Sequence, residues 1–281
     1  MRPYTITFSI VLLLSTVGCG DSDTTTKLFN EDVAPVTSGS WYQPSLTTSW
    51  QWQLAGTINT SYLVDMYDVD LFDTPQNTID TLHADGKKVI CYFSGGSYEN
   101  YRSDAIDFAP EVLGNTLDGW PDEKWLDISN EKIAPLMLAR LDLAKEKGCD
   151  GVEPDNMDGY TNNTGFTLTA SDQLAYNKFI ANEAHKRGLS VGLKNDLNQI
   201  VALEPYFDFS VNEQCHEYSE CNTLVPFINA SKPVFNAEYL QAYQQNNAGA
   251  RDTMCADTIA LHFKTLILAL NLDDSLHFAC D

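Results

Sequence analysis

Short apolar segments alternate with amphipathic stretches from residue 62 onward, and this alternation is the feature that most restricts the fold. A helical pattern between two buried strands is typical of a βαβ unit, in which consecutive strands run parallel. Eight such units predict a (β/α)8 TIM barrel, an α/β fold that takes about 250 residues as a single domain. The runs lie at 62–68, 88–96, 124–129, 150–156, 190–196, 207–214, 233–239 and 265–274.

The stretches between the runs have the boundaries expected of helices. Residues 131–148 and 171–188 each end in Lys or Arg followed by Gly, the usual residues at a helix C-terminus. A further segment, 49–56, lies too close to the first run for a helix between them. We expect it to be an edge segment or cap at the mouth of the barrel.

The N-terminus has the pattern of an export signal. Residues 1–19 begin Met-Arg, continue with a short apolar core and end in Gly-Cys, as secretory signals do, and they are too short for a stable membrane span. The end of this segment, TVGC, resembles a bacterial lipobox, which predicts lipidation of Cys19; ordinary cleavage nearby is the alternative. Residues 20–40 are polar and predict a flexible linker, which leaves 41–281 as the catalytic domain.

Six cysteines remain when Cys19 is set aside, an even number in a chain expected to be exported. This favours disulfides over a metal site, since the chain has no CxxC or paired His spacing. Closeness along the chain predicts the pairs Cys215–Cys221 and Cys255–Cys280, which leaves Cys91 with Cys149.

The formal net charge of −22 argues against a nucleic-acid partner, because phosphate binding needs a basic surface. Two interpretations remain for this acidity: it keeps an exported protein soluble, or its negative field gathers a cationic substrate. We expect a monomer whose one contact with a membrane is the lipid anchor at Cys19.

Polar residues follow the apolar part of most runs, as they do where barrel strands open into a site built by the βα loops. Carboxylates predominate, and of the five histidines only His216 closely follows a run, so a His-based relay or His-ligated metal has little support. The candidates at these ends are Asp65, Asp68, Tyr92, Asp127, Glu153, Asp155, Asn156, Lys194, Asn195, Glu213 and Glu238.

Paired carboxyl groups across a cleft are what cleavage of a glycosidic bond requires. One donates a proton to the leaving oxygen, while the other attacks carbon or activates water. The acids crowded within 150–158 raise one another's pKa, which suits such a pair; the alternative is that Asp158 and others merely form turns or cap helices. Trp52 and Tyr239 are the aromatic residues best placed to stack on sugar rings.

Several blocks of the chain, taken together, resemble glycoside hydrolase family 114, the endo-α-1,4-polygalactosaminidases. They are WQWQLAG, VDMYDVDLFDT, VICYFSGGSYENYRSD, KWLDIS, GCDGVEPDNMDGY, GLSVGLKND, VNEQCHEYSEC and KPVFNAEY, and they span about residues 49–240. The resemblance implies a (β/α)8 barrel that cleaves inside cationic galactosamine polysaccharides. It places the catalytic Asp and Glu of the family at Asp155 and Glu213, whereas Glu153 stands where the family more often has Asp.

Some alternatives stay open. Glu238 is an alternative to Glu213 as the second catalytic carboxylate. Whichever of the two is not catalytic is expected to bind a sugar amine. Lys194 either holds a carboxylate ionised or only neutralises the acid cluster, and Arg102 and Asp104 either brace their loop or contact substrate.

The mechanism requires no metal or organic cofactor. We therefore expect substrate contacts at Trp52, Asp65, Asp68, Tyr92, Asp127, Glu153, Asn156, Lys194, Asn195, Glu238 and Tyr239. Three other functions remain possible: a non-catalytic carbohydrate-binding barrel lipoprotein, a barrel glycosidase for a different glycan, or a deacetylase, which would need two His and an Asp around zinc.

Overall fold

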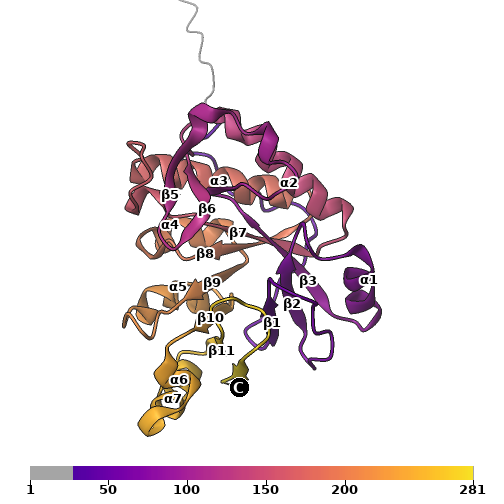
Figure 1. Ribbon diagram of the computed structural model, residues 1–281, viewed down its shortest axis with the longest axis vertical. Coiled ribbons are helices and arrows are strands. Elements are labelled where there is room, and N and C mark those ends of the chain that lie inside the picture. The colour runs from indigo at the N-terminus through magenta and orange to yellow at the C-terminus, as the bar shows by residue number, and fades with distance from the viewer. Residues whose placement is uncertain (1–27, 281) are drawn as a thin grey trace, which may run out of the picture.

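The centre of the molecule is a curled sheet of nine strands, eight of which run parallel (Figure 1). The computed structural model describes residues 28–280, so Cys19 and the expected signal lie outside the described part. The parallel strands are β1 (Trp50–Gln53), β2 (Met66–Asp70), β3 (Lys88–Ser94), β7 (Gly151–Asp155), β8 (Ser190–Lys194), β9 (Phe209–Glu213), β10 (Val234–Glu238) and β11 (Lys264–Leu268).

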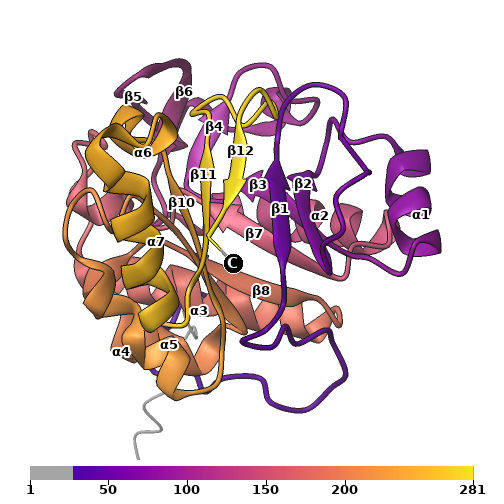
Figure 2. The ribbon, with the colours of Figure 1, turned by 90° about the horizontal axis from the view of Figure 1, so that it is seen from below.

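The two edges of this sheet meet, which closes the barrel. The ninth strand, β12 (His277–Ala279), pairs antiparallel with β11 and lies between β11 and β1 (Figure 2). Leu54 N–H donates to the main-chain oxygen of Leu272 at 3.0 Å, and Trp50 Nε1 donates to that of Lys264 at 2.9 Å. The TIM-barrel prediction is confirmed. Where the two edges of the sheet meet, the barrel is closed by this loop contact and this side-chain contact.

Helices cover the outside of the barrel. Both helices expected at 131–148 and 171–188 form, and each is followed by a glycine with positive φ, Gly148 at 78° and Gly188 at 74°. Glycine adopts this left-handed conformation without the penalty that a Cβ brings. The helices are α1 (Gln76–Ala84), α2 (Ala134–Glu146), α3 (Ala170–Lys186), α4 (Ile200–Leu203), α5 (Val225–Asn229), α6 (Gln241–Gln244) and α7 (Ala250–Ala260).

The run at 124–129 is not a barrel strand, which corrects the prediction. Its first residues end β6 (Trp120–Leu126), which lies between β4 (Ser97–Glu99) and β5 (Leu113–Leu117) in a separate antiparallel sheet. Exposed and buried side chains alternate at the end of β6, as in a sheet with one face in water. The small sheet is an insertion between β3 and α2.

The segment at 49–56 supplies the missing barrel strand, β1, so its expected place as an edge segment or cap is also wrong. All four of its residues are buried. Gln51 and Gln53 are polar residues in a strand buried on both faces, and both amide groups form hydrogen bonds inside the protein. Gln51 Nε2 donates to Asp274 Oδ1 at 3.3 Å, and Gln53 Nε2 donates to the main-chain oxygen of Ala55 at 3.0 Å.

The described part of the expected linker packs against α3, so the interpretation of 20–40 as flexible is wrong for residues 28–36. Phe29 is buried, with its ring centroid 4.9 Å from that of Phe179. Lys178 Nζ donates to the main-chain oxygen of Glu31 at 2.6 Å, and Val36 N–H donates to Asn182 Oδ1 at 2.7 Å. These contacts fix the entry of the chain into the domain.

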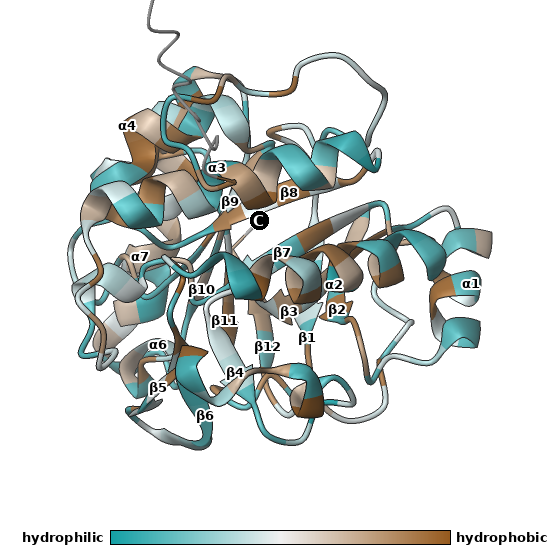
Figure 3. Ribbon diagram, turned by 90° about the horizontal axis from the view of Figure 1, so that it is seen from above, coloured by the Kyte–Doolittle hydropathy of each residue, from teal (hydrophilic) through white to brown (hydrophobic). Residues whose placement is uncertain are grey.

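The core has two layers, one on each face of the curled sheet. Inside the barrel, Trp50, Met66, Ile90, Phe209 and Phe235 fill the end opposite the polar strand ends. A larger cluster lies between the outer face of the strands and the helices. Figure 3 shows brown and teal residues mixed along the helix ribbons, as expected when one face packs on the sheet and the other meets water.

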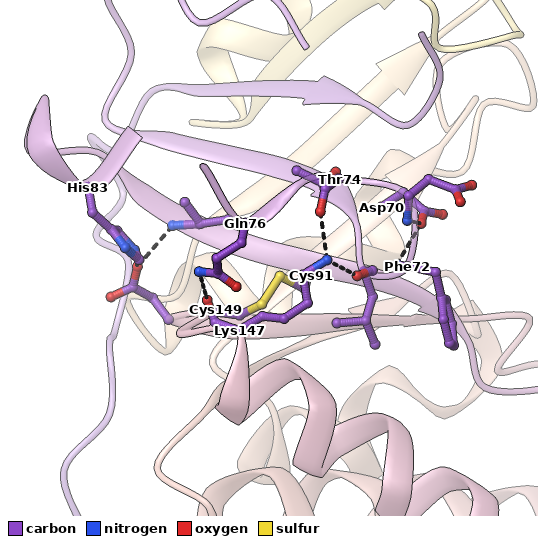
Figure 4. Close-up of a disulfide and its surroundings, with 12 residues drawn as sticks. Asp70, Phe72, Thr74, Gln76, His83, Cys91, Lys147 and Cys149 are labelled. Carbon is purple, nitrogen blue, oxygen red and sulfur yellow. Dashed lines mark hydrogen bonds and ion pairs between the residues drawn. A yellow bond between two sulfur atoms is a disulfide. The ribbon is translucent and has the colours of Figure 1, made fainter. Parts of the chain in front are cut away.

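The three predicted disulfides are confirmed. Cys91 in β3 bonds to Cys149, just before β7, and so links two neighbouring barrel strands (Figure 4). Lys147, two residues earlier, donates to the main-chain oxygens of Leu71 and Thr74, each at 2.6 Å. The other pairs are Cys215–Cys221 and Cys255–Cys280. Between residues 28 and 280, no helix combines the length and apolar character that crossing a membrane requires.

Candidate active site

The carboxyl ends of neighbouring parallel strands bring charged side chains to one mouth of the barrel. Side chains alternate between the two faces of a strand, so Glu213 shares the inner face of β9 with Val211, which belongs to the core inside the barrel. By the same alternation Asp155 ends the inner face of β7 and Lys194 that of β8. These three side chains meet.

Lys194 lies between the carboxylates at this mouth of the barrel. Its Nζ lies 3.1 Å from Asp155 Oδ1, 3.2 Å from Glu153 Oε1 and 3.3 Å from Glu213 Oε2. The same Nζ lies 4.8 Å from the centre of the Trp52 ring, within the range of a cation–π contact. Burial lowers the pKa of Lys194, but the surrounding carboxylates outweigh this effect and raise the pKa well above its usual value. The ammonium group therefore stays charged.

Asp155 accepts hydrogen bonds at both carboxylate oxygens. Tyr92 O–H donates to Oδ2 at 3.0 Å, while Asn156 N–H donates to Oδ1 at 2.7 Å, where Lys194 also lies. Burial first, and then the charge of Asp155, raise the pKa of Tyr92 well above its usual value, so this phenol keeps its proton. Three donors thus hold the Asp155 carboxylate in a fixed orientation.

The backbone around Asp155 is held by the Gly-Gly pair that follows β3. Gly95 and Gly96 N–H both donate to the main-chain oxygen of Asp155, at 2.8 and 3.0 Å. A Cβ on Gly96 would lie 1.8 Å from the main-chain oxygen of Asn156, so only glycine fits this close approach. The SGG motif therefore positions Asp155.

Glu213 accepts from a second tyrosine. Tyr239 O–H donates to Oε1 at 2.6 Å, and Lys194 lies at Oε2. Glu213 N–H donates to Asn195 Oδ1 at 3.0 Å, which ties the end of β9 to the end of β8. The side chain of Glu213 is 26% exposed, so it faces the open mouth.

Each of the three strands that carry these groups is followed by a residue in the left-handed region. The φ angles are 60° for Asn156, 50° for Asn195 and 63° for Gln214. Non-glycine residues in this region carry backbone strain and are enriched at functional sites. Here the abrupt turn ends each strand directly after its charged side chain.

A second pair of carboxyl groups lies beneath Lys194. Asp68 and Glu153 are fully buried. Burial, together with repulsion from Glu153, raises the pKa of Asp68 well above its usual value. Burial also raises the pKa of Glu153, to about 7, although the charge of Lys194 opposes that rise. Both raised pKa values favour a pair that carries less charge than two free carboxylates.

An open cleft of about 410 Å³ lies above these groups. Its floor includes Trp52, Tyr92, Asp155, Lys194 and Glu213. Residues from the small sheet and its flanking loops form one wall, and 270–272 form another. The remaining lining residues are Leu54, Ala55, Asp70, Asp73, Glu99, Tyr101, Arg102, Leu117, Trp120, Glu123, Asn156, Asn195, Gln214, Leu270, Asn271 and Leu272.

Comparison with known proteins identifies the family. The model of glycoside-hydrolase family GH114 matches residues 31–281. The chain belongs to family GH114. It is therefore a glycoside hydrolase, and the family prediction made from its sequence blocks is confirmed.

Solved structures agree. The crystal structure of Aspergillus fumigatus Ega3 in complex with galactosamine is 43% identical, with a TM-score of 0.81 over 86% of this chain and 99% of that one. The glycoside hydrolase domain of PelA from Pseudomonas aeruginosa has a TM-score of 0.65 over 82% and 98% of the two chains, and at 12% identity shows a shared fold alone. No curated protein sequence matches the chain.

The structure of this GH114 chain brings most of the predicted site residues together. Those that line the cleft are Trp52, Tyr92, Asp155, Asn156, Lys194, Asn195 and Glu213. Asp68, Glu153 and Tyr239 support this set from behind. Trp52 is only 2% exposed and lies against Lys194, so it supports the lysine and offers little open surface for stacking.

Three predicted site residues lie elsewhere, which corrects their expected place. Asp65 precedes β2 and so lies at the opposite end of the strand, where its Oδ2 accepts from Ser49. Asp127 follows β6 in the small sheet and accepts from Ser129 Oγ at 2.6 Å. Neither lines the cleft.

Glu238 is the third. It shares a face of β10 with Val234, which packs in the outer core, so it points away from the barrel interior. Its Oε1 accepts from His216 N–H at 2.8 Å and from Asn236 Nδ2 at 3.2 Å. Of the two rivals, only Glu213 reaches the cleft.

Arg102 braces the acidic wall of the cleft. Its guanidinium lies 2.6 Å from Asp70, 2.8 Å from Glu99 and 3.1 Å from Asp73. The sequence left the role of Arg102 open and did not indicate Glu99, Trp120 or the 270–272 segment, because these residues come from the inserted sheet and from the loop between β11 and β12. No sequence signal links those segments to the strand ends.

One group of potential metal ligands occurs within residues 28–280: Cys215, His216 and Cys221, with ligand atoms within 4.8 Å of one another. The two sulfur atoms are bonded to each other, so they cannot act as thiolate ligands.

Proposed function

We propose that this GH114 chain cleaves internal α-1,4 linkages of galactosamine-containing polysaccharide, with Asp155 and Glu213 as the catalytic carboxylates. The observation that carries this proposal is that both carboxylates contact one buried cation, Lys194, at the floor of an open cleft. The galactosamine found with Ega3, which is 43% identical, supports the choice of sugar. A cleft open at its mouth also suits cleavage within a long polymer.

Asp155 is the nucleophile and Glu213 the general acid and base. The Asp155 carboxylate, oriented by three donors, attacks the anomeric carbon while Glu213 donates a proton to the departing glycosidic oxygen. The resulting covalent glycosyl–Asp155 ester is hydrolysed by a water molecule that gives its proton to Glu213. Each carboxyl group thus returns to its starting state.

The wall of the cleft supports recognition of a charged amine. Asp73 has an exposed side chain there, and Glu123 is buried with its Oε2 accepting from Ser97 Oγ at 2.7 Å. Burial raises the pKa of Glu123 to about 7. A protonated sugar amine beside it would favour its ionised form, because an opposite charge lowers the pKa of a carboxyl group.

Incubation with an α-1,4-galactosamine polymer of known acetylation, followed by product sizing, tests the proposal. We expect oligosaccharides from the wild type and a loss of at least about 100-fold in rate for Asp155→Asn and for Glu213→Gln. Glu238→Gln is the matched control, because Glu238 is an acid at a strand end that faces away from the cleft, and it should retain activity.

Failure of the wild type to shorten the polymer while still binding it would favour the carbohydrate-binding alternative. Activity on another glycan but not on galactosamine polymer would favour a different substrate. Full activity of Asp155→Asn would remove the proposed mechanism.

The three disulfides indicate an exported protein, since such bonds persist in oxidising compartments. The proposal includes a signal over residues 1–19, a lipid on Cys19 and a monomeric enzyme. Fatty-acid labelling of the wild type, lost in Cys19→Ser, tests the anchor; light scattering of the purified protein tests the monomer.

A further inference from the structure

A second pocket, of about 340 Å³, adjoins the cleft at the catalytic centre. We call it the side pocket. It shares Asn195, Glu213 and Gln214 with the cleft, and it is also bounded by Asp158, Asp196 and Tyr218. Asp155 and Lys194 line the cleft but not the side pocket. Glu213 therefore faces both spaces, whereas Asp155 faces one.

This asymmetry gives the substrate a direction. The sugar whose anomeric carbon is attacked must lie against Asp155, and hence in the cleft. Glu213 must reach the oxygen that joins this sugar to the next one. The chain beyond that oxygen continues on the other side of Glu213, where the side pocket lies.

We propose that the side pocket binds the leaving-group end of the polymer, namely the galactosamine units on the reducing-end side of the cleaved bond. This inference rests on the proposed function and on the assignment of Asp155 as nucleophile. It adds a second binding site, which determines where along the polymer the enzyme cuts.

Tyr218 offers a stacking surface at this pocket. Its side chain is 62% exposed and lines the side pocket, so its ring is open to a sugar there. It lies in the loop closed by the Cys215–Cys221 disulfide, directly after the catalytic Glu213. The disulfide constrains the backbone of this loop beside the catalytic acid.

The carboxyl groups of Asp158 and Asp196 line the side pocket, where they are placed to bind the charged amine of a galactosamine unit. Asp158 precedes the 3-10 turn Gly159–Thr161 but makes no side-chain cap hydrogen bond there. Asp196 is only 3% exposed; its Oδ2 accepts from Asn177 at 2.9 Å, but its Oδ1 has no hydrogen-bond partner. A buried carboxylate oxygen without a donor is costly unless a cation or donor is supplied. A sugar ammonium in the side pocket would supply this charge.

The pKa values agree with this interpretation. Burial, and next the charge of Asp155, raise the pKa of Asp158 to about 6. Burial, and next Asp158, raise that of Asp196 to about 8. An ammonium group between them would favour both ionised forms.

The cleft has its own exposed aromatic residue at a distance from the side pocket. Trp120 lies at the hairpin between β5 and β6, is 51% exposed and lines the cleft but not the side pocket. Trp120 and Tyr218 thus mark the two sides of the cleaved bond, and the two residues serve as matched probes of the direction in which the polymer lies.

The test uses α-1,4-galactosamine oligosaccharides labelled at the reducing end, with the lengths of the labelled products measured. Tyr218→Ala weakens binding after the cleaved bond, so we expect shorter labelled products and a KM about 2- to 10-fold higher, the range of one aromatic contact. Trp120→Ala weakens binding before the bond and should lengthen them. Leu63→Ala, which removes an exposed side chain away from both pockets, should leave the pattern unchanged.

Asp158→Asn provides a second, independent readout. We expect kcat/KM to fall about 5-fold for the fully deacetylated polymer and less for an acetylated one, because only the free amine carries a charge. Unchanged product lengths in Tyr218→Ala, or shifts in the same direction in Tyr218→Ala and Trp120→Ala, would overturn the inference. If the wild type cleaves none of these oligosaccharides, the proposed function itself has failed.

Discussion

Lys194 Nζ lies 3.1 Å from Asp155 Oδ1, with the lysine side chain only 2% exposed. The same atom lies 3.3 Å from Glu213 Oε2. One buried cation therefore links two carboxylates that come from different strands, and it holds both against their mutual repulsion. The predictions that follow depend on this arrangement and on the groups packed around it.

Replacing Lys194 by Met should both destabilise the fold and change the pH dependence of activity. Removal of the cation leaves Glu153, Asp155 and Glu213 uncompensated, which we expect to cost about 3–5 kcal/mol in the free energy of unfolding. Carboxylates without the nearby cation have higher pKa values, so the acidic limb of the kcat/KM profile should move to higher pH. Urea unfolding and a pH–rate profile measure the two effects.

Lys88→Met is the control for this variant, because Lys88 also pairs with a carboxylate, Asp150, but is 45% exposed. It should cost no more than about 1 kcal/mol. An unchanged acidic limb in Lys194→Met would show that Lys194 does not control the catalytic carboxylates.

The reaction should proceed with retention of anomeric configuration. Because Asp155 Oδ1 and Glu213 Oε2 lie 3.1 and 3.3 Å from the same nitrogen, these two oxygens are no more than 6.4 Å apart. Inverting enzymes need about 6.5–9.5 Å between their carboxyl groups to admit water, whereas retaining enzymes have about 5–5.5 Å. Proton NMR of the first products should show the α-anomer. Initial appearance of the β-anomer would contradict a nucleophilic role for Asp155.

Stability should fall as the pH rises from 5 to 8, and Glu238 should contribute to this fall. Burial raises the pKa of folded Glu238 from 4.5 to about 7. A carboxyl group with a raised folded pKa contributes stability that is fully present below pH 4.5 and is lost as the pH rises through about 7. Urea midpoints of Glu238→Gln should therefore change less between pH 5 and 8 than those of the wild type.

Glu146→Gln, at an exposed position of α2, is the matched control and should keep the wild-type slope. Equal slopes in the wild type and Glu238→Gln would show that Glu238 does not titrate in this range.

Two of the disulfides should have different effects when removed. Cys91–Cys149 closes a separation of 58 residues and Cys215–Cys221 one of 6. Loop-closure entropy predicts losses of about 4 and about 2 kcal/mol in the free energy of unfolding for the double Ala variants. Activity on polymer should fall more for Cys215→Ala/Cys221→Ala, because that bond holds the loop after Glu213. Denaturant titration measures the loss of stability, and product assays measure the loss of activity. A larger loss of stability without Cys215–Cys221, or a larger loss of activity without Cys91–Cys149, would contradict this account.

Much of the barrel could be predicted because strand ends carry a local signal. A buried run that finishes in polar residues places those residues at one mouth, and this sufficed for Asp155, Lys194 and Glu213. The same rule misplaced Asp127, since a short strand that belongs to an inserted antiparallel sheet has a similar composition. It also missed β1, because the short distance between 49–56 and the first run leaves no room for a helix and so suggested an edge segment. Only the tertiary structure shows that this segment is a fully buried barrel strand, in which Gln51 and Gln53 donate hydrogen bonds within the interior.

The prediction that Glu238 contacts substrate failed for a different reason. Glu213 and Glu238 both end a strand, but they lie on opposite faces, because side chains alternate along the backbone and the inner face is set by which neighbours pack inside the barrel.

The order of the residues along this chain by itself predicted the barrel, from its alternation of apolar runs and amphipathic stretches, and the disulfide pairs, from the closeness of cysteines along the chain. Its sequence blocks indicated the family by resemblance, and the same resemblance placed the proposed catalytic pair at Asp155 and Glu213. Only the tertiary structure decided that Lys194 joins the carboxylates, that Glu238 faces away, and that Trp120, Tyr218 and residues 270–272 surround the catalytic centre. These relations join segments far apart in sequence, and they exist only once the sheet has closed and its loops have packed over one mouth.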